Sequence, residues 1–232
     1  TGVVVVPATW VTWKIQDRMK DYFILLYLVT AGVYGAFVIL DLFFWFLFYE
    51  MALMPMYLLI GVWGSTRKEY GAMKLMMMLL AGSIFIFTVI FAVFSHVGAG
   101  TFDMVVLLEA HKDPAFQKTF FPLLVIGCGT LGAMFPFHSW SPDGHAAAPT
   151  SVSMLHAGVL MKVGAFGVVR LGYQMMPEGG AYWSPALIIL GSTAGLYGAI
   201  SALRQTDMKL LMGFSSVSHM GYVFLGLGTF NA

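Results

Sequence analysis

Long apolar segments separated by short polar ones dominate the pattern of this 232-residue chain. A bilayer core takes about 20 helical residues, and the apolar runs lack the strict alternation that marks barrel strands. Seven segments are long enough to span a membrane, and they lie near residues 22–40, 42–63, 73–95, 119–136, 150–172, 183–203 and 210–230. The pattern therefore predicts an all-α fold, a polytopic membrane helix bundle of about seven transmembrane helices.

A single charged residue, Asp41, separates the first two segments. It favours a tight turn between two helices, and one long tilted helix over residues 22–63 is the alternative. With this turn, eight basic residues gather in the loops of one side, and they are Lys14, Arg18, Lys20, Arg67, Lys68, Lys74, Arg204 and Lys209. The opposite loops hold Lys112 and Lys118, with Arg170 at a helix end. The positive-inside rule predicts that the first side is cytoplasmic or its organellar equivalent.

The composition excludes several classes of function. With 59% hydrophobic and 10% charged residues, the chain has too few charges to cover a soluble domain, for which about a quarter is usual. A net charge of +1 gives no sign of nucleic-acid binding. The single cysteine, Cys128, lies in an apolar run without the partners that a disulfide or metal cluster needs. We therefore expect no cofactor, no metal and no redox chemistry on this chain.

The first 21 residues differ from the rest, because an apolar patch is followed by a charged stretch from Lys14 to Asp21. We interpret residues 1–21 as an amphipathic or loop lead-in without a cleavable signal peptide. The chain has no initiator Met and both ends are abrupt, which suggests a fragment.

Two ionisable residues, Glu50 and Lys162, lie near the middle of apolar segments. Such a group costs roughly 3 kcal/mol on insertion scales, so it persists mainly where it lines a polar pathway or finds a partner. We expect both side chains to be buried near the bilayer midplane. Pro55 follows Glu50 and predicts a weak point in the helix beside a proton stop. The alternatives are a structural glutamate clipped to another helix and a lysine that snorkels to the interface.

The fourth segment runs into three prolines, Pro136, Pro142 and Pro149. We predict a helix break between Met134 and Pro149, with His138 or His145 pointing inward as proton relays. Ordinary capping histidines in an interfacial loop are the alternative.

The next segment carries His156 six residues before Lys162. On a regular α-helix the two side chains diverge by about 120 degrees and lie about 9 Å apart along the axis. They could therefore face one hydrated path, although a packing histidine would fit the pattern equally well.

Four stretches together resemble the NuoM-type antiporter-like subunit of respiratory complex I. They are WFLFYEMALMPMYLLIGVWG (45–64), PFHSWSPDGH (136–145), APTSVSMLHAGVLMK (148–162) and QTDMKLLMGFSSVSHMG (205–221). The resemblance implies an inverted-repeat fold of about fourteen helices, of which this chain would hold the fourth to the tenth. Residues 22–172 would then form the first five-helix repeat, a proton half-channel, and residues 173–232 the start of the second.

The resemblance also implies residue roles. Glu50 matches the family's mid-helix glutamate, Lys162 its central-axis lysine, and His219 the histidine of Ser-Val-Ser-His-Met-Gly. One position departs from the family, because Leu131 stands where a lysine usually pairs with the glutamate. His156 replaces a residue that is more typically apolar, and we predict that it supplies the missing base between Glu50 and Lys162.

The function expected from these residues is proton translocation by a membrane subunit of a complex I-like NADH/quinone oxidoreductase, driven by electron transfer elsewhere. The expected partners are protons, lipid and the other membrane-arm subunits. A bacterial cytoplasmic membrane is favoured, with an organellar inner membrane or thylakoid as alternatives. A Mrp-type cation/proton antiporter or membrane-bound hydrogenase subunit remains open, as does a non-pumping structural subunit.

Overall fold

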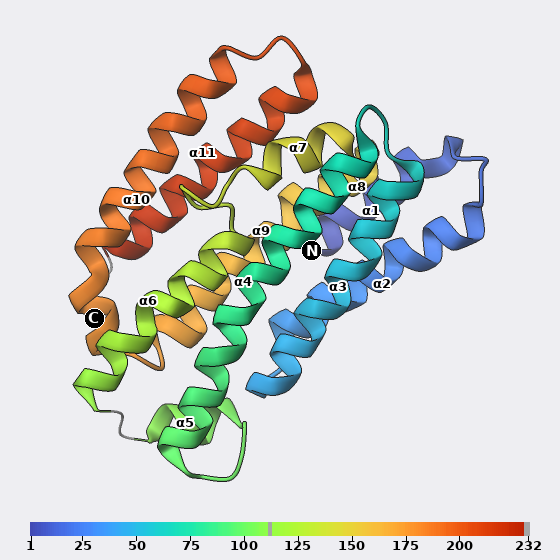
Figure 1. Cartoon of the computed structure of the whole chain (residues 1–232). Coiled ribbons are helices and arrows are strands. Elements are labelled where there is room, and N and C mark those ends of the chain that lie inside the picture. The colour runs from blue at the N-terminus through green and yellow to red at the C-terminus, as the bar shows by residue number, and fades with distance from the viewer. Residues whose placement is uncertain (111–112, 230–232) are drawn as a thin grey trace.

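The computed structural model describes residues 1–110 and 113–229, without the side chain of Lys14. The described elements are all helical (Figure 1). In chain order they are α1 (Gly2–Val11), η1 (Thr12–Lys14), α2 (Met19–Val38), α3 (Leu42–Trp63), α4 (Lys68–Val97), α5 (Met104–Glu109), α6 (Pro114–Leu131), α7 (Trp140–Ala147), α8 (Thr150–Leu155), η2 (His156–Leu160), α9 (Met161–Gly167), η3 (Val168–Tyr173), α10 (Pro177–Leu203) and α11 (Met208–Gly228).

Among the described residues, six helical rods are long and apolar enough to cross a membrane. They are α2, α3, α4, the continuous rod from α8 to η3, α10 and α11. The seventh predicted span corresponds to α6, an 18-residue helix that begins with polar residues and ends before the broken region. The all-α fold predicted from the apolar pattern is confirmed, and the chain is a multi-pass membrane protein.

Two helical hairpins flank the centre of the bundle. The α2 and α3 pair forms one flank and the α10 and α11 pair forms the other, with α4, α6 and the α8 to η3 rod between them (Figure 1). Close approach of α4 and α6 depends on glycine, because a Cβ on Gly127 would lie 2.8 Å from the Gly82 carbonyl oxygen. The central helices therefore pack with their backbones nearly in contact.

The turn at Asp41 is confirmed. The Asp41 side chain caps α3 by accepting a 2.9 Å hydrogen bond from the Phe44 backbone amide. The loop before α5 pairs with this turn, since the Leu42 amide donates to the Phe102 carbonyl at 2.9 Å and the Met104 amide donates to the Leu40 carbonyl at 2.8 Å. Two separate helices, rather than one long tilted helix, thus cover residues 19–63.

The positively charged connections meet at one end of the bundle. Lys209 Nζ, at the start of α11, donates to Ser65 Oγ at 3.2 Å and to the Ala148 carbonyl at 2.8 Å. The lead-in lies at the same end, because Trp63 Nε1 donates to the Asp17 carbonyl at 2.8 Å. This arrangement agrees with the predicted grouping of these loops, while Lys112 lies outside the described residues. Which side of the membrane this end faces stays a prediction.

Several predicted bounds are corrected. The lead-in is largely helical, since the apolar helix α1 packs on α8 and buries Ala8. Helix α4 spans 30 residues, because the polar residues from Lys68 continue it beyond the apolar run 73–95. Helix α10 begins at Pro177, six residues before the apolar run 183–203, because proline suits the first turn of a helix.

Pro55 is not a break or hinge. Helix α3 runs without interruption from Leu42 to Trp63 with Pro55 inside it. The ring removes one backbone donor, but the buried neighbours Ala52, Leu53 and Met56 hold the helix against the bundle on either side of it. The helix therefore stays continuous at Pro55 because of its packing, although a weak point was predicted there.

Candidate functional site

Glu50 lies half-buried in the middle of α3 and is held from α4. Ser83 Oγ donates a short hydrogen bond to Glu50 Oε1. The Tyr49 hydroxyl lies 3.0 Å from the same Ser83 Oγ, and the Leu79 carbonyl lies 3.0 Å from Ser83 Oγ and 3.5 Å from the Tyr49 hydroxyl. Each hydroxyl can donate once and accept twice, so Tyr49 can donate to Ser83 while Ser83 donates to a Glu50 carboxylate. The acid thus ends a chain of two hydroxyl groups.

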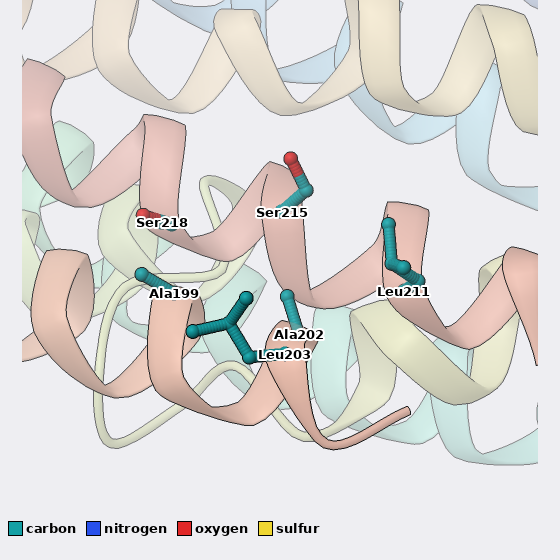
Figure 2. A pocket seen from close by; sticks show the side chains of 6 residues that line it. All are labelled: Ala199, Ala202, Leu203, Leu211, Ser215 and Ser218. Atoms are coloured by element: carbon teal, nitrogen blue, oxygen red, sulfur yellow. The ribbon is translucent and has the colours of Figure 1, made fainter. Parts of the chain in front are cut away.

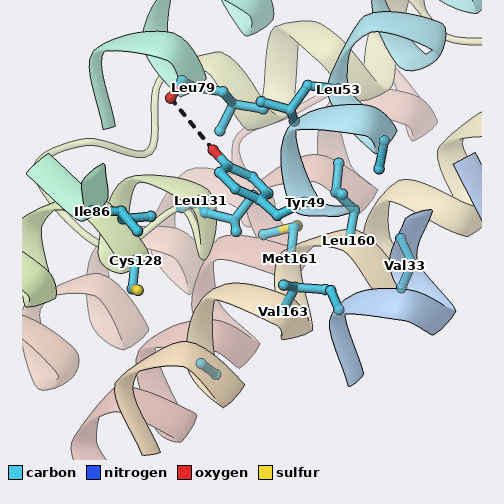
Figure 3. Close-up of a cluster of buried hydrophobic side chains, with 14 of the residues drawn as sticks. Val33, Tyr49, Leu53, Leu79, Ile86, Cys128, Leu131, Leu160, Met161 and Val163 are labelled. Atoms are coloured by element: carbon cyan, nitrogen blue, oxygen red, sulfur yellow. Dashed lines mark hydrogen bonds between the residues drawn. The ribbon is translucent and has the colours of Figure 1, made fainter. Parts of the chain in front are cut away.

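An apolar wall stands behind this chain. Leu53, Leu131, Leu160 and Met161 are each at most 1% exposed and surround the Tyr49 ring (Figure 3). Leu131 is the last residue of α6, and its side chain lies in this wall. No basic side chain among the described residues makes a hydrogen bond or ion pair with Glu50. Leu131, at the position where the resemblance implies a lysine, is thus buried among apolar side chains.

The predicted helix break is confirmed, but it starts earlier than expected. Helix α6 ends at Leu131 rather than near Met134, because the backbone turns at Gly132 and Ala133 takes a left-handed φ of 52°. Pro136 lies inside the break as predicted. Pro142 instead lies in the first turn of α7. Backbone amides in the first turn of a helix have no carbonyl partner within the helix, so proline costs no hydrogen bond there.

His138 and His145 both point inward, at 7% and 1% exposure. His138 lies in the break and packs edge-on against Tyr197 of α10, with ring centroids 4.8 Å apart. His145 lies in α7, and its Nδ1 is 2.7 Å from Ser153 Oγ of α8. His145 also stacks on a second predicted proton carrier, His156.

Three aromatic rings stack where α7 crosses the next helix. His156 lies between Trp140, with centroids 4.9 Å apart and planes at 18°, and His145, with centroids 4.4 Å apart and planes at 12°. Trp140 is fixed by a 2.9 Å hydrogen bond from its Nε1 to the Thr130 carbonyl. The order Trp140, His156, His145 leaves both faces of the His156 ring covered.

His156 makes no direct contact with Glu50 among the described residues, and its role as the base between Glu50 and Lys162 stays a prediction. Its ring lies in the stack, where its charged neighbours are His145 and Lys162, and no contact joins it to Glu50. The regular 120-degree offset also fails, because residues 156–160 form a π-helical turn that winds less per residue than an α-helix. Tertiary stacking and this turn together set the direction of the ring.

The predicted burial of Lys162 is wrong for this chain, and that of Glu50 is only partial. Lys162 is exposed, and its Nζ donates to the Ala157 carbonyl at 2.5 Å. This bond folds the side chain back along its own helix. The ammonium group therefore lies beside the residue that follows His156.

His219 is on an exposed face of α11. No hydrogen bond or ring contact joins it to any of the other described histidines. The structure therefore does not bring His219 into the cluster of His145 and His156.

Several polar residues of the site are absent from the sequence prediction. Lys74 of α4 forms an ion pair with Asp143 of α7, with Nζ 2.6 Å from Oδ2. Ser83 and Trp140 also belong here, through the bonds described above. A small hydroxyl within an apolar span is a signal that could have found Ser83, because such groups bond across helices. No local sequence signal identifies Trp140 as a site residue, because its contact with His156 depends on the tertiary placement of α7.

A cavity of about 330 Å³ opens beside the stack, between the α8 to η2 rod and α11. Its lining includes polar groups of both, and the residues are His145, Thr150, Ser153, Met154, Ala157, Met208, Lys209, Met212 and Ser216. A second cavity of about 290 Å³ lies between α10 and α11 (Figure 2). It has no ionisable lining residue, since Ala199, Ala202, Leu203, Leu211, Ser215 and Ser218 surround it.

Among the described residues, no three His, Cys, Asp or Glu side chains lie close enough together to hold a metal ion. Cys128 is a buried free thiol in the core.

The chain is similar to a broad set of known proteins. Residues 40–232 match the family model described as NADH:quinone oxidoreductase/Mrp antiporter, TM. An NAD(P)H-quinone oxidoreductase chain 4 of a Picosynechococcus species is 37% identical over 230 residues, which cover 99% of this chain and 42% of the relative. Chain 4 of Gloeobacter violaceus is 35% identical over 229 residues, 99% of this chain and 44% of the relative. The chain thus spans less than half the length of these relatives.

Solved structures of related membrane complexes match the fold of this chain. A chain of respiratory complex I from Thermus thermophilus matches with a TM-score of 0.89 and 26% identity, over 97% of this chain and 48% of that one. A chain of the Mrp complex from a Dietzia species matches with a TM-score of 0.78 and 26% identity, over 90% and 23%. An archaeal membrane-bound sulfane sulfur reductase has the same fold, with a TM-score of 0.87 at 22% identity over 97% of this chain and 48% of that one.

Proposed function

Because the chain belongs to the NADH:quinone oxidoreductase/Mrp antiporter transmembrane family, we propose that it forms part of a proton-translocating membrane subunit of an NAD(P)H-quinone oxidoreductase. Electron transfer would occur elsewhere in that complex. This chain would respond by moving protons along its polar groups, since a change in one buried charge alters proton binding at the next.

The relatives support the choice of complex. Two chain 4 proteins of cyanobacterial NAD(P)H-quinone oxidoreductases are 37% and 35% identical to this chain over 99% of its length. From them we infer that its partners are other membrane-arm subunits and that its membrane is a bacterial cytoplasmic or thylakoid membrane. The relatives are more than twice as long, so the proposed activity belongs to a longer polypeptide or assembly than the described helices.

One observation carries the proposal, which is the environment of Glu50. The carboxyl group lies half-buried in mid-span, bonded to Ser83, which in turn meets Tyr49. An ionisable group in a span is costly unless it serves a polar pathway or finds a partner, and here the partners are hydroxyls that can pass a proton. A purely structural clip would not need an acid at this position.

The test is a Glu50→Gln substitution in the complete complex, reconstituted into sealed vesicles. Glutamine keeps the size and can still accept from Ser83, but it cannot release a proton. We expect quinone reduction in the presence of an uncoupler to continue, while the number of protons moved for each electron pair falls. Glu69→Gln, on the exposed first turn of α4, is the matched control and should leave that number unchanged. An unaltered ratio in Glu50→Gln would reject the proposal.

Leu131 favours a second candidate, a non-pumping structural subunit. The fully buried leucine leaves Glu50 without a basic partner, so the acid and its hydroxyls would only join α3 to α4. This candidate predicts normal pumping in Glu50→Gln and in Lys162→Met, with assembly impaired instead.

The match to a Mrp complex chain supports a third candidate, a cation/proton antiporter. The same vesicles distinguish it without a new variant. An antiporter would exchange sodium for protons in the absence of NADH and quinone, whereas the proposed subunit moves protons only while electrons flow.

A further inference from the structure

A third cavity, of about 270 Å³, lies between α6 and α10. The two helices meet closely where they begin, because a Cβ on Gly179 would lie 2.6 Å from the Gln117 carbonyl oxygen. The Glu178 amide also donates to Gln117 Oε1 at 3.0 Å. Deeper in the bundle, the cavity separates residues 122–126 of α6 from residues 183–190 of α10. The helices therefore diverge from a shared starting point and leave a gap between them.

The described side chains that line this cavity are aliphatic or aromatic. The one polar hydrogen among them, on Trp183 Nε1, is donated to the Lys118 carbonyl at 2.8 Å. Apolar cavities stay dry and take apolar molecules. Because Pro122, Ile126 and Leu190 are only half-buried, such a molecule can enter from outside the bundle. In a bilayer the apolar molecules at this place are acyl chains.

The shape of the cavity suits an acyl chain. Its lining on α10 runs from Trp183 to Leu190, which corresponds to about 10 Å along the helix axis. Because α10 is a candidate membrane span, this direction follows the lipid chains. The cavity therefore takes a stretch of several methylene groups, and each one that it shields from water or fills with contacts adds to binding.

A cation lies beside the starting end of the cavity. Lys118 is exposed and lies one helical turn before Pro122, on the same face of α6. Its Nζ is 5.0 Å from the centroid of the Tyr182 ring of α10, which directs the ammonium group across the gap between the helices. Tyrosine, tryptophan and lysine side chains gather where a span meets the membrane surface. Lys118, Tyr182 and Trp183 therefore mark the level of the lipid headgroups.

The charge of Lys118 is available to an outside anion. Asp113, which precedes α6, and Glu178, in the first turn of α10, are the nearest acids along the two helices. Neither forms an ion pair with Lys118 among the described residues. A phosphate group at headgroup level supplies the matching negative charge.

The other end of the cavity belongs to the broken helix. Met134 and Phe137 line it, and both lie in the irregular stretch between α6 and α7. Met134 is held there by its backbone amide, which donates to the Gly129 carbonyl at 2.8 Å. An acyl chain in the cavity would pack against these two side chains and support the irregular backbone from the side that faces α10.

We propose that the cavity between α6 and α10 binds one acyl chain of an anionic phospholipid, whose phosphate group is held by Lys118. The chain enters beside Trp183 and reaches Met134 and Phe137. The Tyr182 ring keeps the ammonium group near the mouth of the cavity, where the phosphate accepts a hydrogen bond from it. This site does not depend on proton translocation, because it requires only the packing of α6, α10 and the broken helix.

The test uses the complete complex in mild detergent and a phosphatidylglycerol that carries a diazirine in the middle of one acyl chain. After irradiation, peptide mass spectrometry locates the attached lipid. We expect the label within residues 134–137 and 186–190, which surround the inner part of the cavity. No label in either segment overturns the proposal, since a helix of the longer polypeptide or of another subunit would then cover the cavity.

A pair of matched variants tests the acyl-chain part. Ala186→Phe fills the cavity from α10, and we expect it to abolish the label in both segments. Ala202→Phe makes the same change in the same helix but at the cavity between α10 and α11, and the label should persist. A label that survives Ala186→Phe would mean that the lipid binds elsewhere on the surface and would contradict the proposal.

The headgroup part is tested by charge. Lys118→Gln should lower the labelling by phosphatidylglycerol about fivefold, as expected for the loss of one exposed charge pair. Lys20→Gln removes an exposed lysine before the opposite end of the bundle and should leave the labelling unchanged. A phosphatidylcholine with the same diazirine chain, which has no net charge, should label the native complex less. Equal labelling by the two lipids, or no effect of Lys118→Gln, would overturn the assignment of an anionic lipid.

Discussion

Around Glu50 the polar groups are one carboxyl and two hydroxyls, whereas around His156 they are two imidazoles and an indole. The first group joins two regular helices, α3 and α4, by hydrogen bonds. The second joins a broken helix to a π-helical turn by ring stacking, beside a cavity. On the acid side, the apolar wall that contains Leu131 packs around the Tyr49 ring.

The difference shows how one bundle can keep an acid and a base apart. Among the described contacts, Glu50 has a fixed hydroxyl partner but no base, and His156 has a neighbour, His145, that lines the cavity, but no acid. A lysine at position 131, as the resemblance implies, could have paired with the Glu50 carboxylate. With leucine there, any coupling between Glu50 and His156 has to pass through water or through a change of helix packing.

The largest expected effect comes from removing one face of the ring stack. Trp140→Ala deletes a fully buried indole and its bond to the Thr130 carbonyl, and such truncations cost about 3–5 kcal/mol. We expect a marked fall in the thermal unfolding midpoint of the complex subunit in detergent. Trp13→Ala, at a tryptophan that is 84% exposed, is the control and should change the midpoint little. Equal effects in the two variants would mean that the stack does not stabilise the break.

An intermediate effect is expected on the acid side. Ser83→Ala removes the donor to Glu50 and the nearest partner of the Tyr49 hydroxyl, which leaves buried polar groups unpaired at a cost of about 1–3 kcal/mol. The same unfolding assay measures it. Ser95→Ala serves as the control, because the exposed Ser95 bonds only within its own helix. If Ser83→Ala were as mild as Ser95→Ala, the hydroxyl chain would contribute no stability.

The smallest effect is expected at the ion pair that joins α4 to α7. Lys74 and Asp143 lie 2.6 Å apart, but their side chains are 24% and 36% exposed, so Lys74→Met should cost at most about 1 kcal/mol. Raising the salt concentration to about 1 M should remove most of the difference from the native protein. A loss as large as that of Ser83→Ala, unaffected by salt, would show that this pair, rather than the ring stack, anchors the broken helix.

Much of the architecture was predictable from local sequence. The length of the apolar runs predicted the spanning rods, Asp41 predicted the turn that it caps, and the prolines after Met134 predicted the break. These features depend on helix length, capping and backbone chemistry, which act over a few residues.

The arrangement of the site was less predictable, because it depends on tertiary contacts. The stack exists only because α7 lies beside η2, so that Trp140 and His145 both stack on the His156 ring. The π-helical turn at residues 156–160 changes the direction of the ring and has no clear local signal. Exposure of Lys162 depends on which helices cover its face, and a mid-span position alone does not determine that.

The most direct test of the account asks whether the two regions serve one proton path. The measurement is the proton-to-electron ratio of the complete complex in Glu50→Gln, in His156→Gln and in the double variant, at matched rates of quinone reduction. Groups that act in series give non-additive losses. We predict that the double variant loses no more than either single variant. A double variant that loses the sum of the two single losses would contradict the account, because the regions would then act on separate paths.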